Sequence, residues 1–175
     1  MKLDIISTES GKSVTVRPAA AADAEALTGI YNHYVRESIA TFHEEPLSPS
    51  EMSAQLRGVE SAELPWLVAE ADGKILGYAY AGKWKGRCAY RFSVEITAYL
   101  VPGYQGRGIG SKLYGCILGI LRDKGIHSVI GGIALPNDAS IALHEKFGFR
   151  KVAHFRETGF KFGRWVDVGY WQRTL

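Results

Sequence analysis

The sequence is poor in the residues that form covalent or metal-bound frameworks. It has two cysteines and five histidines among 175 residues, with no Cys/His cluster. We therefore expect neither a disulfide framework nor a bound metal. Cys116 falls on the predicted buried face of a helix, where a reduced core residue is the better interpretation.

Long apolar runs and runs of like charge are also missing. No segment is long enough to span a membrane, and residues 1–12 lack the apolar core of a signal peptide, so a cytoplasmic protein without membrane contacts is expected. The net charge of +3 is well below the basic excess of nucleic-acid-binding proteins, but it suits a small anionic ligand. We expect an N-terminal extension over 1–12 and a single domain over 13–175.

The most informative segment is 99–111, with the sequence Tyr-Leu-Val-Pro-Gly-Tyr-Gln-Gly-Arg-Gly-Ile-Gly-Ser. An apolar strand pattern ends at Pro102, glycines follow at alternate positions, and apolar residues then recur at helical spacing. Glycines let successive N–H groups point into one concavity, and the helix start adds partial positive charge, so the segment predicts a phosphate site. The spacing fits neither a P-loop nor a dinucleotide fingerprint, because Ile109 and Ser111 stand at key positions. A tight connection that binds nothing is the alternative.

Strand and helix patterns alternate along the rest of the chain. Ser48 and Glu51 form a capping box at the start of a helix, and Asp72-Gly73 predicts a hairpin turn. This order predicts a three-layer α/β domain, with a mixed central sheet of about six to seven strands and helices on both faces. The expected strands are 14–17, 66–70, 75–81, 94–101, 129–133 and a terminal pair within 152–171; the expected helices lie around 27–34, 48–59, 109–124 and 137–147.

Two ionisable residues stand out in these elements. Glu95 interrupts an apolar strand, and a buried carboxylate is costly unless it has a partner or a role, so it is either paired with an arginine or a base of raised pKa. His144 follows Asn137 by seven residues, two turns along one helix face, and an imidazole suits proton transfer near neutrality. The alternative for this segment is a plain helix capped by Asn137, with a structural histidine.

A basic loop precedes the Glu95 strand. Lys85, Arg87 and Arg91 are interleaved with Trp84 and Tyr90. Arginine offers a bidentate site to a carboxylate or phosphinate, so the loop could hold an anionic substrate. A solvated surface loop is the alternative.

Several segments resemble one enzyme family. The pattern Gln105-x-x-Gly108-x-Gly110 resembles the coenzyme A pyrophosphate loop of the GNAT superfamily of N-acetyltransferases, and the order of elements resembles the GNAT fold. From Val14 to Arg173 the chain is similar to phosphinothricin N-acetyltransferases and their relatives acting on methionine sulfoximine. Arg91-Phe92 departs from the acidic residue and Trp common in that family, which could shift the amino-acid preference. The matching segments include 30–34, 65–70, 80–85, 135–138 and 159–173.

The resemblance implies an acetyl-CoA-dependent N-acetyltransferase for the α-amino group of phosphinothricin, methionine sulfoximine or a related small amino acid, with direct attack in a ternary complex. It implies Glu95 as the base and His144 as a second base or as the acid for the departing thiolate. The implied substrate contacts are Phe42, Lys85, Arg87 and Tyr90. The implied cofactor contacts are Ala98, Tyr99, Leu100, Gln105, Gly106, Arg107, Gly108, Ile109, Gly110, Ser111, Asn137 and Ser140.

Other functions stay open at this point. An acetyltransferase of protein N-termini or polyamines is one alternative, although a polyamine site should be acidic where this loop is basic. A non-catalytic acyl-CoA-binding module is another, and the presence of both Glu95 and His144 weighs against it. The aromatic residues between 155 and 171 predict a homodimer.

Overall fold

The computed structural model describes residues 3–7 and 13–175. The strands are β1 (Leu3–Ser7), β2 (Ser13–Pro18), β3 (Trp66–Ala71), β4 (Lys74–Lys83), β5 (Ser93–Leu100), β6 (Ser128–Leu135), β7 (Arg150–Lys161) and β8 (Arg164–Thr174). The helices are α1 (Ala24–Glu37), α2 (Pro49–Ser61), α3 (Ile109–Asp123) and α4 (Asp138–Lys146), with short 3-10 helices at Ala21–Asp23 and Cys88–Tyr90.

All described strands belong to one sheet, in the order β1-β2-β3-β4-β5-β6-β8-β7. Every neighbouring pair is antiparallel except β5 and β6, so the sheet is mixed as expected. The sheet has eight strands, one more than expected, because β1, which lies in the segment assigned to an N-terminal extension, pairs with β2. A five-residue strand gives too short a pattern to identify from sequence.

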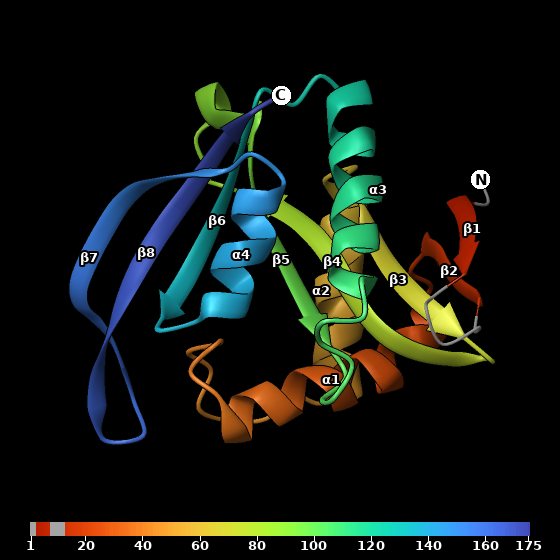
Figure 1. Cartoon of the computed structure of the whole chain (residues 1–175), viewed down its shortest axis with the longest axis horizontal. Coiled ribbons are helices and arrows are strands. Elements are labelled where there is room, and N and C mark those ends of the chain that lie inside the picture. The colour runs from red at the N-terminus through yellow and green to blue at the C-terminus, as the bar shows by residue number, and fades with distance from the viewer. Residues whose placement is uncertain (1–2, 8–12) are drawn as a thin grey trace.

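Helices cover both faces of the sheet, which confirms the predicted three-layer fold (Figure 1). On one face α1 and α2 pack through Leu27, Tyr31 and Met52 onto Trp66 and Tyr78. On the other face α3 and α4 pack onto the side chains that alternate along the central strands. This larger core includes Val16, Leu67, Ala79, Val94, Ile96, Ile109, Leu113, Tyr114, Ile117, Leu121, Val129, Ile133, Phe149 and Trp171.

Local sequence features form as predicted. Ser48 Oγ accepts from the Glu51 N–H at 3.3 Å, and the Glu51 carboxylate accepts from the Ser48 N–H at 2.7 Å, which completes the capping box of α2. In the β3–β4 turn, Asp72 and Gly73 have φ of 51° and 72°, the left-handed pair that an Asp-Gly hairpin needs.

Several expectations about composition can be compared with the described residues. Neither cysteine is in a disulfide; Cys88 is exposed and Cys116 is half-buried at the margin of the α3 core. Within residues 3–7 and 13–175, no helix has the length and apolar character needed to cross a membrane. The same residues contain no group of three His, Cys, Asp or Glu side chains placed to hold a metal ion.

The β5–β6 pair opens the sheet at its centre. Only Ser93, Val94 and Glu95 of β5 pair with β6, opposite Ser128 to Ile130. Both strands continue for five more residues, and each stays paired with its other neighbour, β4 or β8. The two arrowheads in Figure 1 accordingly point apart. A V-shaped opening therefore begins directly after Glu95.

A close contact on β4 generates the first prediction. A Cβ added at Gly77 would lie 2.4 Å from Leu100 Cδ2 and 2.8 Å from the Tyr99 carbonyl oxygen. We expect Gly77→Ala to lower the free energy of unfolding by about 1–3 kcal/mol, measured by urea denaturation, because backbone must move. Gly82→Ala on the same strand is the control, since its Cβ would have no neighbour within 4 Å. Equal stability of the two variants would contradict the close packing.

Candidate active site

The glycine loop between β5 and α3 has the conformation that its sequence predicts. Gly103, Gly106 and Gly108 have φ of 81°, 76° and 79°, which only glycine adopts readily. Gly108 is the N-cap of α3 and provides no side-chain cap to the first turn. No acidic residue lies in that turn. The first N–H groups of α3 are therefore available to an anion.

Neighbouring side chains fix the shape and charge of this loop. Gln105 Oε1 accepts from the Gly103 N–H at 2.9 Å, so Gln105 braces the loop from within. The Arg107 guanidinium lies 4.8 Å from the centre of the Tyr104 ring. Lys146 Nζ donates to Ser111 Oγ at 2.9 Å, beside the start of α3. Arg107, which directly precedes the N-cap, and Lys146 therefore add positive charge near the helix N-terminus, which favours an anion there.

Open space above the loop allows close approach of a ligand to the backbone. Cβ atoms added at Gly103, Gly106 or Gly108 would meet no atom within 4 Å, whereas one at Gly110 would lie 3.3 Å from Leu143 Cδ2. Gly110 and Ile109 are buried and serve helix packing. The loop thus presents backbone rather than side chains, and the residues present fit the pyrophosphate of coenzyme A.

Ala98, Tyr99 and Leu100 lie on the part of β5 that borders the V-shaped opening. The Leu100 carbonyl accepts from the Tyr34 hydroxyl at 2.6 Å, and the Tyr99 ring packs among the α1 and α2 residues. Across the opening, Asn137 Oδ1 accepts from the Ser140 N–H at 3.1 Å and caps α4. The two groups of implied cofactor contacts, on β5 and at the start of α4, therefore border the same gap.

Glu95 is half-buried where the opening begins. Burial raises the pKa of its carboxyl group, while the charge of Lys85 and a hydrogen bond from the Gly132 N–H act in the opposite direction. A Cβ at Gly132 would lie 2.9 Å from Glu95 Oε1 and 3.1 Å from the Tyr170 ring, so only glycine leaves room for the carboxylate. No ion pair between Glu95 and an arginine occurs among the described residues. A partly desolvated base fits this environment better than a structural ion pair.

His144 is a core residue with both ring nitrogens engaged. It is 4% exposed, and its ring contacts Tyr114 and Phe149 edge-on. Nδ1 donates to the Ser140 carbonyl at 2.8 Å, so Nε2 accepts from the Tyr114 hydroxyl at 3.0 Å in the neutral ring. Burial lowers the pKa of His144. The neutral form is therefore favoured.

The two ionisable residues approach β6 from opposite faces. A Cβ at Gly131 would lie 2.1 Å from His144 Nε2, whereas the Cβ position of Gly132 is taken up by Glu95 and Tyr170. Successive strand residues point to opposite faces of a sheet, so β6 separates His144 from Glu95.

The basic loop gathers three of the four expected substrate contacts. Lys85, Arg87 and Tyr90 line a cavity of about 200 Å³, together with Arg91. Phe42 lies elsewhere, with its ring against Gly159 of β7, where an added Cβ would be 2.1 Å from Phe42 Cε1. The loop precedes β5 directly, and Lys85 is close enough to influence the pKa of Glu95.

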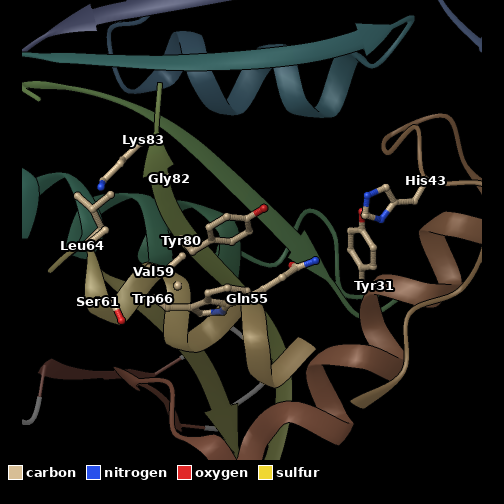
Figure 2. Close-up of a pocket in the computed structure, with 12 residues that line it drawn as sticks. Tyr31, His43, Gln55, Val59, Ser61, Leu64, Trp66, Tyr80, Gly82 and Lys83 are labelled. Carbon is tan, nitrogen blue, oxygen red and sulfur yellow. The ribbon is translucent and has the colours of Figure 1, made fainter. Parts of the chain in front are cut away.

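A larger cavity of about 540 Å³ lies between α2 and the β3–β4 strands. Gly82, one of its lining residues, pairs with Glu95 in the β4–β5 register, so the cavity and the carboxylate share a face of the sheet. In Figure 2 the Tyr80 hydroxyl and the Gln55 amide extend toward the side where Tyr31 and His43 lie. The cavity gives the Glu95 face room for a small molecule.

Sequence patterns missed three residues of this region. Tyr34 holds the Leu100 carbonyl, Tyr170 packs beside Glu95, and Tyr114 bonds to His144. Tyr34 and Tyr170 lie in segments that resemble the enzyme family, but no local pattern assigned them a contact. Their partners are 66, 75 and 30 positions away in the chain, respectively.

Comparisons with known proteins agree with this geometry. A family model described as an acetyltransferase (GNAT) domain matches residues 16–169. The phosphinothricin N-acetyltransferase of Streptomyces viridochromogenes is 44% identical over 164 residues, covering 94% of this chain and 89% of that protein. The L-methionine sulfoximine/L-methionine sulfone acetyltransferase of Salmonella typhimurium is 36% identical over 162 residues, covering 93% and 95%.

A solved structure supports the same assignment. The GNAT superfamily phosphinothricin acetyltransferase of Sinorhizobium meliloti, in complex with AcCoA, superposes with a TM-score of 0.90 at 39% identity, covering 93% of this chain and 88% of that one. The fold, the glycine loop and the opened strand pair define an acetyltransferase. The chain belongs to the GNAT acetyltransferase family, which confirms the resemblance found in its sequence.

The glycine loop generates the second prediction. Gly108→Ala places a methyl group at the N-terminus of α3, where we expect an anion, so acetyl-CoA affinity should fall by about tenfold or more, equivalent to about 1.4 kcal/mol. Isothermal titration calorimetry measures this. Gly103→Ala is the matched control, because it carries the same backbone strain at a φ of 81° but lies away from the helix start. Equal losses in both variants would show that strain, not the anion site, is responsible.

Proposed function

We propose that this acetyltransferase transfers the acetyl group of acetyl-CoA to the α-amino group of a small, glutamate-like amino acid, with phosphinothricin and methionine sulfoximine as the first substrates to assay. The observation that carries the proposal is a desolvated carboxylate, Glu95, at the point where β5 and β6 separate. The basic loop that enters the same strand supports an anionic substrate. The names of the relatives described above point to the same substrates.

Binding of the cofactor uses the backbone. The first turn of α3 and the loop from Gln105 to Ser111 would hold the pyrophosphate, and Arg107 would add charge. The β5 edge from Ala98 to Leu100 would orient the pantetheine arm, with Asn137 and Ser140 on the other side of the opening. Acetyl-CoA supplies the acetyl group as a thioester.

Glu95 would prepare the amine. It takes a proton from the substrate ammonium, directly or through water, and the free amine then attacks the thioester carbonyl. The new C–N bond forms as the C–S bond breaks, and coenzyme A leaves as a thiolate, which takes up the proton that the new amide nitrogen loses. Backbone N–H groups of β5 at the opening would stabilise the developing oxyanion. Burial makes Glu95 a stronger base than an exposed glutamate.

His144 would act as a second, weaker base. It lies on the face of β6 opposite Glu95. Its Nε2 accepts from Tyr114, so it must release that hydrogen bond before it takes up a proton. Its lowered pKa favours the neutral ring. We therefore expect loss of His144 to reduce turnover less than loss of Glu95.

The acidic end of the amino acid would bind the basic loop. Arg87 offers two parallel N–H donors to a carboxylate or phosphinate, with Lys85 and Tyr90 in the same cavity. Phe42 would contact the substrate from the α1–α2 connection, on the side of β7.

We also propose a homodimer that works in the cytoplasm without nucleic-acid or membrane partners. Phe155, Phe160, Phe162 and Trp165 of the β7–β8 hairpin are each half exposed or more. Such a cluster of exposed aromatic side chains supports a protein–protein contact.

Substitution of Glu95 tests the proton transfer. Glu95→Gln keeps the size of the side chain but cannot accept the proton, so kcat should fall by about 10²–10⁴-fold. The carboxylate must be ionised to act, so wild-type kcat/KM should decline as pH falls through the raised pKa of Glu95. In the variant this decline should disappear, and only the ionisation of the substrate amine should remain. Thiol release from acetyl-CoA, followed across pH, measures both effects.

His144→Ala and Tyr114→Phe complete this experiment. Glu95→Gln, His144→Ala and Tyr114→Phe should all keep the wild-type affinity for acetyl-CoA. A fall in kcat can then be assigned to the chemical step rather than to cofactor binding. Wild-type turnover in Glu95→Gln would remove the proposed base and revive the acyl-CoA-binding module as the better interpretation.

Substitution of Arg87 tests the anion site. Arg87→Lys keeps the charge but loses the paired donors, and a hydrogen bond to a charged group contributes about 1.5–3 kcal/mol, so KM for phosphinothricin should rise by about tenfold or more. The acetyl-CoA affinity should not change. Arg122→Lys, an exposed site on α3, is the control. An unaltered KM would identify the loop as solvated surface, and a panel including N-terminal peptides and polyamines would then seek another amine.

A further inference from the structure

Lys161, the last residue of β7, is a buried cation that neither the fold nor the proposed chemistry explains so far. It is 1% exposed. Its Nζ donates to the carbonyl oxygens of Thr41 at 2.7 Å, Ser38 at 2.8 Å and Tyr34 at 3.4 Å. The three N–H groups of the ammonium therefore all point to main-chain acceptors in one short stretch of chain, 120 or more positions away.

Those acceptors belong to the end of α1 and the segment after it. Carbonyl groups at a helix C-terminus carry partial negative charge, so a cation there is favoured, and the Tyr34 carbonyl accepts from Lys161 in addition to the Ser38 N–H. No carboxylate forms an ion pair with Lys161 among the described residues. Burial lowers the pKa of Lys161, so the carbonyls offset a real desolvation cost.

Lys161 holds the segment Ser38–His43, which connects α1 toward α2. This segment lies next to the 540 Å³ cavity on the Glu95 face of the sheet, where the substrate amine would bind and which we call the amine site. Thr41 Oγ1 and His43 Nδ1 both bond to the Tyr31 hydroxyl, at 2.7 and 3.0 Å. Tyr31 and His43 line the 540 Å³ cavity. Phe42 packs on Gly159, two residues before Lys161 on β7. Figure 1 shows this connection beside the lower part of the β7–β8 hairpin.

A buried ion is a poor way to add stability, because apolar residues of similar size often do as well or better. A lysine that satisfies three main-chain carbonyls instead specifies where that main chain lies. We propose that Lys161 is a positioning residue of the amine site: it holds the segment Ser38–His43 against the β7–β8 hairpin, and thereby keeps Phe42 and the cavity wall in the geometry that binds the amino-acid substrate. This inference rests on the proposed function.

The test compares Lys161→Met, Phe42→Ala and the double variant in steady-state kinetics. Lys161→Met removes the donors at similar length, so KM for the amino acid should rise by about tenfold, equivalent to about 1.4 kcal/mol, while acetyl-CoA affinity stays at the wild-type value. If Lys161 acts through Phe42, the double variant should lose no more than the worse single variant. Lys161→Arg keeps the charge and the donors, so its KM for the amino acid should lie between those of the wild type and Lys161→Met.

The matched control is Arg173→Met. Arg173 Nη1 also donates to a main-chain carbonyl, that of Phe147, at 2.6 Å. This carbonyl does not belong to the segment Ser38–His43. It should lose thermal stability without a change in KM. The same result for Lys161→Met, or additive losses with Phe42→Ala, would overturn the positioning role. If Lys161→Met does not fold, Lys161→Gln replaces it, and an unchanged KM there has the same meaning.

The assay uses whichever amine the wild-type protein acetylates best. If the proposed substrate is wrong, the wild-type protein will prefer another amine in the substrate panel. If the role of Lys161 is wrong, only the comparison of the variants will show it.

Discussion

The short parallel pairing of β5 with β6 is the constraint on which the rest of the site depends. Because the ladder ends at Glu95, the sheet opens between two strands that each remain paired on the other side. The glycine loop, the α4 cap and the carboxylate all lie around that opening. A fully paired sheet would leave no gap for an extended ligand at its centre, and Glu95 would have no neighbouring space to act in.

Gly131 and Gly132 allow side chains to approach β6 closely from both faces of the sheet. One leaves room for the His144 ring and the other for the Glu95 carboxylate, so two consecutive positions on one strand are fixed by side chains that come from α4 and β5. This arrangement also explains the unequal environments of the two groups. Glu95 lies opposite Gly82, which lines the large cavity, whereas His144 is held in a core by Tyr114 and Ser140.

Features that depend on neighbouring residues could be predicted from the sequence. The Ser48 cap, the Asp72-Gly73 turn and the left-handed glycines of the loop formed as expected, because each depends on a few adjacent positions. Contacts between distant segments could not be predicted in this way: neither the Tyr114 hydroxyl on His144 nor the carbonyl cluster around Lys161 leaves a periodic pattern. β1 was missed because five residues carry too little pattern.

Gly82 has a consequence for the range of amines that this scaffold could accept. It faces Glu95 across the β4–β5 ladder and lines the large cavity, yet an added Cβ there would touch nothing within 4 Å. The width of the cavity next to the carboxylate is therefore set by a missing side chain rather than by packing. Protein engineers could narrow the acceptor range by enlarging this one position, without repacking the core beneath it.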